Sequence, residues 1–170
     1  VSNPYYADAG ERIGGTVGIP LPNVSLRITN DAGQACKCGE IGMIEVKGPG
    51  IFKGYWQMPE KTREEFTSDG WFRTGDLGRW GGEVNGQTIP PEYVSIVGRG
   101  KDLIISGGFN VYPSDLESVL RQHPAVQDAA VVGVASEQWG ETPVAFVVLR
   151  PNKCLQAIEL MNWVNQRMGK

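Results

Sequence analysis

Two glycine-rich segments of this chain carry charged side chains that could contact a phosphorylated ligand. The first is Trp71–Leu77, which contains Asp76, and the second is Gly98–Gly108, which contains Arg99 and Lys101. Glycines let a backbone approach a ligand closely, and loops are where binding residues concentrate. An aspartate supplies only hydrogen-bond acceptors, whereas an arginine supplies a fixed fork of donors. Together the two segments predict a polar site for a phosphorylated ligand.

Each segment taken alone also fits an ordinary structural role. Thr-Gly-Asp suits a turn between strands and Gly-Arg-Gly-Lys suits a solvated loop, because glycine and charged residues are common in both. In that interpretation Asp76 caps a turn, and Arg99 forms a surface ion pair that contributes little to stability. Both interpretations stay open for each residue on its own.

The elements that position these residues are, in the first hundred positions, mainly strands. Apolar and β-branched residues predict strands over 24–29, 41–47, 71–74 and 93–97. Residues 59–66 are polar and begin with proline, which predicts one or two helical turns. The segment Trp80–Pro91 contains the turn signal Asn85-Gly86 and predicts an enlarged hairpin tip. The strand over 93–97 leads directly into the turn that carries Arg99.

The pattern changes after Lys101. Short apolar runs predict strands over 102–106, 129–134 and 144–149, and a helical segment is predicted after the first and after the third. This order is typical of a small α+β domain. The chain is therefore predicted to be α+β, with a mainly β unit, a boundary near Lys101 and a small α+β domain after it.

Two signatures define the helices of this second domain. Ser114 and Glu117, just after Pro113, form a capping box that opens a helix expected to end near His123. His123 is therefore predicted to be a capping or surface residue and not a base. A second helix begins near Leu155. Four apolar residues on one of its faces predict core packing: Ala157, Met161, Val164 and Met168.

The composition excludes several classes of function. Hydrophobic residues make up 41% of the 170 positions, which is enough to bury a core, and the net charge is -3 with acids and bases intermixed. Such a chain has no basic patch for nucleic acid. No run approaches the ~20 apolar residues of a membrane helix, and the first residues show no basic-then-apolar signal pattern. A cytoplasmic location is expected.

The soft metal ligands are few. The chain has three cysteines, Cys36, Cys38 and Cys154, and one histidine, His123. An odd cysteine count and a single histidine do not make a closed zinc site, and cytosolic disulfides are rare. Reduced thiols and no metal ligand are expected.

Four motifs, in their order along the chain, resemble those of the adenylate-forming enzymes, the superfamily of acyl-CoA synthetases, peptide-synthetase adenylation domains and luciferases. The motifs are Gly39–Gly42 with Gly54-Tyr55-Trp56, Trp71–Leu77, Gly98–Gly108 continuing to Pro113, and Trp139-Gly140-Glu141. The resemblance covers nearly the whole chain. Around Met43–Pro49 it is greatest to bacterial malonyl-CoA synthetases and related acyl-CoA ligases.

The resemblance implies a domain organisation and a reaction. Residues 1–100 correspond to the β-rich, distorted barrel-like end of the large AMP-binding domain, and residues 101–170 to the small mobile lid domain. The implied enzyme joins a carboxylic acid, malonate or a similar short acid, to AMP with release of pyrophosphate, and then transfers the acyl group to coenzyme A. It would use ATP, coenzyme A and Mg²⁺, whose ligands are expected outside this chain.

The resemblance also implies roles for individual residues. Asp76 would hold the ribose hydroxyls, Arg99 would contact the nucleotide, and Lys101 would be the hinge whose backbone torsions change when the lid rotates. Many acyl-CoA synthetases have aspartate at that hinge position. Gly107 and Gly108 would lie against the pantetheine arm of coenzyme A, where a Cβ would collide. A plain turn or bulge is the alternative for this pair of glycines.

The chain also departs from the family pattern. Family members are several times longer, so the phosphate loop, the acyl pocket and the Thr-Glu motif are expected before Val1. The catalytic lysine is expected after Lys170, because Gly169-Lys170 lies too early, so no catalytic residue is assigned and the chain alone is expected to be inactive. Trp139-Gly140-Glu141 receives no catalytic role. Two alternatives stay open: an adenylation domain that loads a carrier protein, and a non-catalytic binding module with the lid fold.

Overall fold

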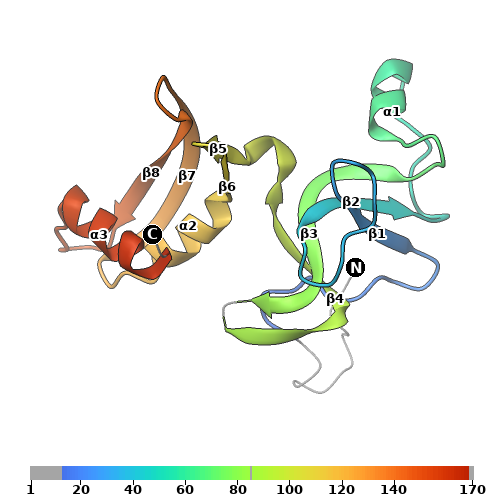
Figure 1. Cartoon of the computed structure of the whole chain (residues 1–170). Coiled ribbons are helices and arrows are strands. Elements are labelled where there is room, and N and C mark those ends of the chain that lie inside the picture. The colour runs from blue at the N-terminus through green and yellow to red at the C-terminus, as the bar shows by residue number, and fades with distance from the viewer. Residues whose placement is uncertain (1–12, 85, 169–170) are drawn as a thin grey trace. The chain divides into compact units, whose positions relative to one another are not determined.

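The computed structural model describes residues 13–84 and 86–168 and divides into two compact units, Val1–Gly100 and Lys101–Lys170. Each unit has its own four-stranded antiparallel sheet, and three α-helices occur among the described residues (Figure 1). The fold is α+β, as the sequence predicts.

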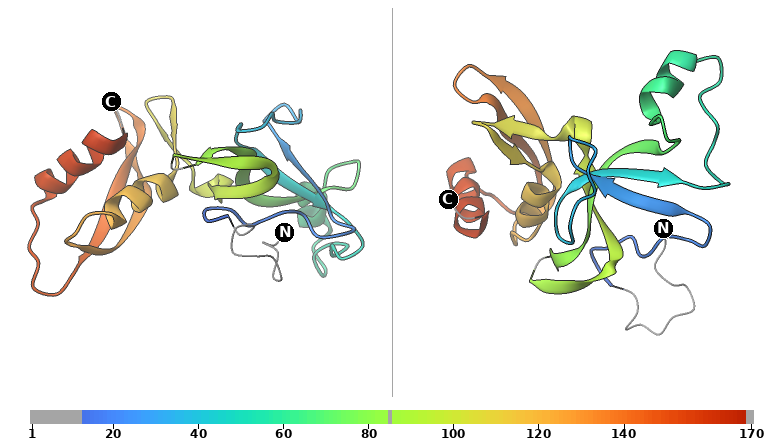
Figure 2. Two further views of the ribbon diagram at one scale, coloured as in Figure 1. Left: turned by 90° about the horizontal axis from the view of Figure 1, so that it is seen from below. Right: turned by 45° about the vertical axis from the view of Figure 1, so that its right-hand side comes forward.

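The first unit is built on a sheet with the order β1-β2-β3-β4. Its strands are β1 (Ser25–Thr29), β2 (Gly42–Lys47), β3 (Phe72–Val84) and β4 (Gln87–Arg99). β1 and β2 match the predicted strands to within one residue. β3 and β4 are 13 residues each, far longer than predicted, and form the long curved hairpin seen in Figure 2.

The segment Trp80–Pro91 is long because most of it belongs to β3 and β4. The predicted enlarged tip is in fact a continuation of the ladder, in which Gly82 pairs with Ile89 and Val84 with Gln87. Register shifts at Leu77/Gly78 and at Trp80/Gly82 interrupt the pairing, and such bulges bend a strand. Asn85 of the turn signal lies outside the described residues, while Gly86 has the positive φ of 77° that a tight turn needs.

The core of the first unit lies between its strands and the chain before them. Ile28 of β1, Ile44 of β2 and Val94 of β4 are buried together, and Val17, Leu26, Val46 and Trp80 pack around them. The helix α1 (Pro59–Glu65) begins at a proline, which has no N–H to leave unsatisfied in the first turn, and it buries none of its residues. The predicted one or two helical turns are confirmed.

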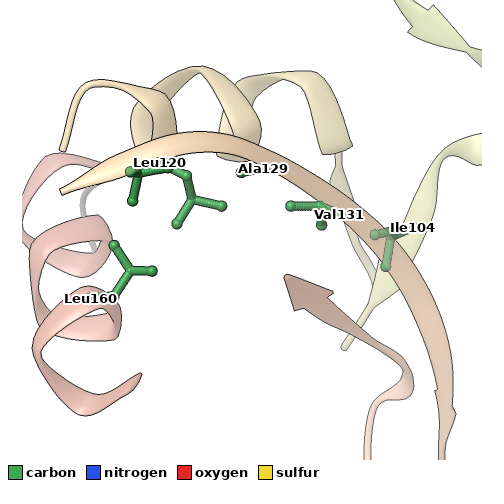
Figure 3. Close-up of a cluster of buried hydrophobic side chains, with 6 residues drawn as sticks. Ile104, Leu120, Ala129, Val131 and Leu160 are labelled. Atoms are coloured by element: carbon green, nitrogen blue, oxygen red, sulfur yellow. The ribbon is translucent and has the colours of Figure 1, made fainter. Parts of the chain in front are cut away.

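The second unit begins in a short 3₁₀ turn, Gly100–Asp102, and its sheet has the order β6-β5-β8-β7. The strands are β5 (Ile104–Ser106), β6 (Phe109–Val111), β7 (Val126–Ser136) and β8 (Gly140–Leu149), and the helices are α2 (Pro113–Arg121) and α3 (Ala157–Met168). Its core joins both helices to the sheet. Figure 3 shows Leu120 of α2 and Leu160 of α3 with Ala129 and Val131 of β7 and Ile104 of β5.

Two expectations about the helices of this unit are wrong in detail. The N-cap of α2 is Tyr112, whose side chain makes no capping hydrogen bond, and Pro113 starts the helix two residues earlier than a capping box of Ser114 and Glu117 requires. The carboxylate of Glu117 instead accepts the Val131 N–H at 3.0 Å and pairs with Arg121. The long-range contact with β7 therefore replaces the local one.

The four apolar residues predicted to pack in the core from α3 are not all buried. Leu160 is its buried residue, whereas Met161 is 58% and Met168 43% exposed. The buried face of α3 is therefore rotated by about one residue from the predicted one. It contains Leu160, with Trp163 and Val164 half-buried beside it. Successive helical residues are separated by about 100°, so a shift of one residue turns half of the stripe outward.

Candidate functional site

Asp76 and Arg99 lie directly opposite each other on β3 and β4. Arg99 Nε and Asp76 Oδ1 are 2.8 Å apart, and the side chains are 57% and 25% exposed. The structure thus joins the two predicted ligand residues in one acid–base pair. A guanidinium has five N–H donors, so an arginine that binds a carboxylate through Nε still carries donors for a second group.

The Thr-Gly-Asp segment is not the predicted turn between strands but lies within β3, at a register shift against β2 between Met43 and Glu45. Thr74 Oγ1 donates a hydrogen bond to the Ile44 carbonyl of β2 at 3.0 Å and accepts one from the Asp76 N–H at 3.1 Å. Gly75 has φ of +77°, a left-handed conformation that glycine adopts without steric cost. The threonine hydroxyl therefore fixes the irregular backbone of β3 at this point, and the carboxylate of Asp76 pairs with Arg99.

A buried carboxylate that the sequence analysis missed stabilises the same sheet. The Glu45 side chain on β2 is 6% exposed and contacts Arg27 on β1 and Arg73 on β3, its direct register partners. A charge in the middle of an apolar strand, as in Gly-Met-Ile-Glu-Val-Lys, was the available signal, because such a charge is buried only when it is paired.

The charge network continues to the surface through Arg27. Its guanidinium also binds Asp69 at 2.9 Å and lies 4.5 Å from the Trp71 ring centre. The side-chain hydrogen bond of Thr67 and the contact with Arg27 lower the pKa of Asp69 to about 2. Arg27 therefore links Trp71, the first residue of the Trp71–Leu77 segment, to the buried carboxylate of Glu45.

Lys101 is an exposed residue in the 3₁₀ turn Gly100–Asp102 and is the first residue of the second unit. The division of the chain between Gly100 and Lys101 thus falls at the residue to which the hinge role was assigned. The structure describes one conformation of this turn.

Gly107 and Gly108 form the two-residue turn between β5 and β6. Their φ angles are 58° and 82°, the left-handed values of the mirror-image turns that join short hairpins. A Cβ on Gly107 would lie 2.9 Å from the Trp139 ring, whereas nothing lies within 4 Å of the Cβ position on Gly108. Gly108 therefore has open space beside it, and Gly107 is covered.

The Trp139-Gly140-Glu141 motif lies beside this turn. The Gly107 N–H donates to the Trp139 carbonyl at 2.8 Å, and the Ile105 N–H donates to Glu141 Oε2 at 2.8 Å. The Gly-Gly turn and the Trp-Gly-Glu motif, which are over 30 residues apart in the sequence, are therefore hydrogen-bonded to each other.

The remaining candidate chemical groups are dispersed. His123 Nδ1 accepts the Ala125 N–H at 3.1 Å and its ring packs on Trp163, so it closes the end of α2. The three cysteines are unpaired, and burial, with the nearby Glu40 charge, raises the pKa of the Cys36 thiol.

Over residues 13–84 and 86–168 no three metal-binding side chains come together, and no helix is both long and apolar enough to cross a membrane. Gly169-Lys170 lies outside the described residues.

The curled antiparallel sheet with its Thr-Gly-Asp segment and paired arginine, followed by an α+β unit with a Gly-Gly turn, agrees with the fold of the adenylate-forming enzymes that the motifs resemble. Two family models match: "AMP-binding enzyme" over residues 3–56 and "AMP-binding enzyme C-terminal domain" over residues 115–170. The chain belongs to the adenylate-forming, AMP-binding superfamily and corresponds to its C-terminal portion.

Curated relatives share this portion. An indoleacetate–CoA ligase from Aromatoleum aromaticum is 38% identical over 164 residues, which is 96% of this chain and 30% of the relative. A 2-succinylbenzoate–CoA ligase from Geobacillus kaustophilus is 41% identical over 156 residues, which is 92% of this chain and 30% of the relative. The chain thus spans about three-tenths of the length of the curated relatives that it matches.

A solved structure of a relative matches nearly the whole chain. ATP-bound MatB from Rhodopseudomonas palustris is 45% identical, with a TM-score of 0.88 over 99% of this chain and 31% of that protein. The apo form of the same MatB gives a TM-score of 0.66 over 98% of this chain and 31% of that protein at the same identity. The two MatB structures therefore differ from each other in the portion that this chain matches.

Proposed function

We propose that this chain is part of an ATP-dependent acyl-CoA synthetase. In the first half-reaction a carboxylate oxygen attacks the α-phosphorus of ATP, the bond to pyrophosphate breaks, and an acyl-adenylate forms. In the second half-reaction the thiol of coenzyme A loses its proton and attacks the acyl carbon, and AMP leaves. The relatives named above as CoA ligases support this reaction class. The observation that carries the proposal is the Asp76–Arg99 pair, which lies next to the positive-φ residue Gly75 of β3.

In this proposal Asp76 and Arg99 bind the nucleotide. The Asp76 carboxylate accepts hydrogen bonds from the ribose hydroxyls, and Arg99 donates to the ribose or to phosphate oxygens while its Nε holds Asp76. The pair is exposed enough for a ligand to reach it, and Thr74 ties the neighbouring backbone of β3 to β2. Pre-formed donors and acceptors of this kind reduce the cost of ordering the site when the nucleotide binds.

Mg²⁺ would neutralise the phosphate charge of ATP during adenylation. No three metal-binding side chains come together in the part of the chain that the structure describes. We assign no Mg²⁺ ligand to the described residues and no step to the metal.

The two units would have different tasks. Val1–Gly100 is proposed to be the β-rich end of the large AMP-binding domain, and Lys101–Lys170 the mobile lid, with Lys101 at the hinge. Two observations support this: the division of the chain at Lys101 and the match of the C-terminal family model to 115–170. A hinge needs a few residues that absorb a change in φ and ψ, and a short 3₁₀ turn can supply them.

Gly107 and Gly108 are proposed to contact coenzyme A. The open space beside Gly108 supports this role, because a narrow pantetheine chain could lie against the backbone there. The positive φ angles would by themselves require glycine, so the plain-turn interpretation predicts the same residues. The two interpretations differ in what a methyl group at Gly108 would do to coenzyme A binding.

The finer proposal for the acid is malonate or a similar short acid. It is supported by the 45% identity to MatB, a malonyl-CoA synthetase, against 38–41% for the curated ligases of larger aromatic acids named above. ATP and coenzyme A as substrates, with three unpaired cysteines, favour the cytoplasm as the location.

The complete gene product that contains residues 1–170 tests this function. It should release pyrophosphate from ATP when given malonate and should then form malonyl-CoA, which mass spectrometry detects. Thioester formation with indoleacetate or 2-succinylbenzoate but not malonate would refute the choice of acid. Acyl transfer to a holo carrier protein but not to coenzyme A would identify the alternative adenylation domain. Absence of any acid-dependent pyrophosphate release would overturn the enzymatic proposal in favour of a binding module.

The residue roles can be tested in a MatB chimera, in which this chain replaces the matched portion of the R. palustris enzyme. The chimera should catalyse both half-reactions, and Asp76→Ala should raise the KM for ATP about tenfold or more, because a ligand hydrogen bond to a charged group is lost. Glu60→Ala, on the exposed face of α1, is the matched control. An unchanged KM for ATP in the Asp76 variant would refute the ribose role.

A further inference from the structure

The β5–β6 hairpin that carries the Gly107-Gly108 turn is joined to the rest of its sheet by few backbone contacts. β5 has only three residues, and its register with β8 consists of one pair, Ser106 with Gly140. β6 lies beyond β5 at the edge of the sheet. A hairpin of two three-residue strands is marginally stable by itself, so other contacts must hold it.

Glu141 supplies one of these contacts. Its carboxylate oxygen Oε2 accepts the Ile105 N–H at 2.8 Å, so a side chain takes the place of a carbonyl in the ladder between β5 and β8. A hydrogen bond to an ionised acceptor is roughly twice as strong as a neutral one. The carboxylate fits because residue 133 is glycine: a Cβ there would lie 3.2 Å from both Glu141 Oε1 and Ile104 Cγ1.

The residue two positions earlier supplies a second contact. The carbonyl of Trp139 accepts the Gly107 N–H at 2.8 Å, and the Trp139 ring covers the position that a Cβ on Gly107 would occupy. The backbone reverses between these two contacts at Gly140, which has φ of +77°. Glu141 and Trp139 therefore hold β5 and the turn from the same side, at Ile105 and at Gly107.

We propose that Glu141 is a positioning residue for the coenzyme A half-reaction, acting through Ile105 and the Gly107-Gly108 turn. This inference rests on the proposed coenzyme A role of the two glycines. Asp76 and Arg99 belong to the other compact unit, so loss of the Glu141 contact should leave adenylation unchanged. Thioester formation should fall because the turn is no longer held in one conformation when coenzyme A arrives.

The contact itself is tested in the 170-residue chain by amide hydrogen exchange. Glu141→Ala should raise the exchange rate of the Ile105 amide about tenfold or more, which corresponds to the loss of one charge-assisted hydrogen bond. Glu141→Gln keeps an acceptor oxygen and should retain most of the protection. Glu137→Ala removes an exposed acid in the connection between β7 and β8 and should leave the Ile105 exchange rate unchanged. Equal protection of Ile105 in the Glu141→Ala and unaltered chains would overturn the proposal.

The functional consequence is tested in the MatB chimera by assaying the half-reactions separately. Glu141→Ala should raise the KM for coenzyme A about tenfold, with acid-dependent ATP–pyrophosphate exchange within twofold of the unaltered chimera, and Glu141→Gln should restore the KM. Loss of both half-reactions in parallel, or of neither, would overturn the positioning role. If the unaltered chimera catalyses ATP–pyrophosphate exchange but forms no thioester, the proposed coenzyme A function is wrong, and so is the positioning role of Glu141. The amide hydrogen exchange of Ile105 would in that case still test the Glu141–Ile105 contact by itself.

Discussion

Asp76 and Arg99 are register partners on adjacent strands, and their side chains form an ion pair of 2.8 Å. They are 23 residues apart in the sequence and form the first pair of the β3–β4 ladder, so the register of this hairpin brings them together. The two register shifts in that hairpin are part of this alignment, because a slip of one residue would place Asp76 and Arg99 on opposite faces.

The Asp76–Arg99 pair is expected to matter for binding and not for stability. Because both side chains are partly in solvent, Asp76→Asn should change the free energy of unfolding of the chain by less than about 1 kcal/mol. The same change should weaken AMP binding to the MatB chimera about tenfold or more. Urea denaturation and calorimetric titration measure the two effects. A loss of stability with unaltered AMP affinity would make this an ordinary structural ion pair.

Glu45 should behave in the opposite way. Its side chain is buried between Arg27 and Arg73, so Glu45→Gln should lower the free energy of unfolding by about 1.5–3 kcal/mol, because two guanidinium groups lose their shared counter-ion. Urea denaturation followed by tryptophan fluorescence measures this. Glu60→Gln, which removes an exposed ion pair with Arg63, should stay within about 0.5 kcal/mol. Equal effects of the two substitutions would contradict the buried network.

Asp69 should make the stability of the first unit depend on pH under acidic conditions. The Thr67 hydrogen bond and the Arg27 contact lower the pKa of Asp69 to about 2 from the ordinary 3.8. A carboxyl with a lowered folded-state pKa stabilises the fold above the unfolded value, and this contribution is lost as pH falls from about 4 toward 2. Thermal unfolding at pH 5 and at pH 2.5 should show a smaller pH effect in Asp69→Asn. An identical pH dependence in both chains would refute the contact.

Gly107 and Gly108 should differ in their tolerance of a methyl group. Gly108→Ala should cost about 1–2 kcal/mol from the left-handed φ alone, whereas Gly107→Ala should cost more, because its Cβ would also displace the Trp139 ring. Chemical denaturation of the two variants gives the order. In the MatB chimera, the coenzyme A role further predicts that Gly108→Ala raises the KM for coenzyme A. An unchanged KM would leave the plain turn as the reason for this glycine.

The three thiols should react at different rates. Burial and the Glu40 charge raise the pKa of Cys36, and only the thiolate is nucleophilic, so iodoacetamide at pH 7.5 should alkylate the exposed Cys38 and Cys154 before Cys36. Peptide mass spectrometry over a time course resolves the sites. Denaturation in urea should remove the difference, and fast labelling of Cys36 in the folded chain would show that it is not shielded.

Much of the fold was predictable because its signals are local. The β-branched runs of β1 and β2 and the proline that starts α1 act within a few residues, and the structure agrees with them. The full length of β3 was not predictable, since its glycines and register shifts hide the alternation that marks a strand. The role of Glu117 was mispredicted for a related reason, because its carboxylate accepts the Val131 N–H of β7 instead of capping α2.

The sequence by itself determined the family, through the content and order of four short motifs, and it marked Asp76, Arg99 and the glycines as candidates for a site. Only the tertiary structure decided how these residues combine. Strand register joined Asp76 to Arg99, enclosed Glu45 between two arginines and brought Glu141 to Ile105. The physical reason is that a hydrogen-bonded ladder aligns residues by position in the sheet, and local sequence preferences carry no information about which strand will be the neighbour.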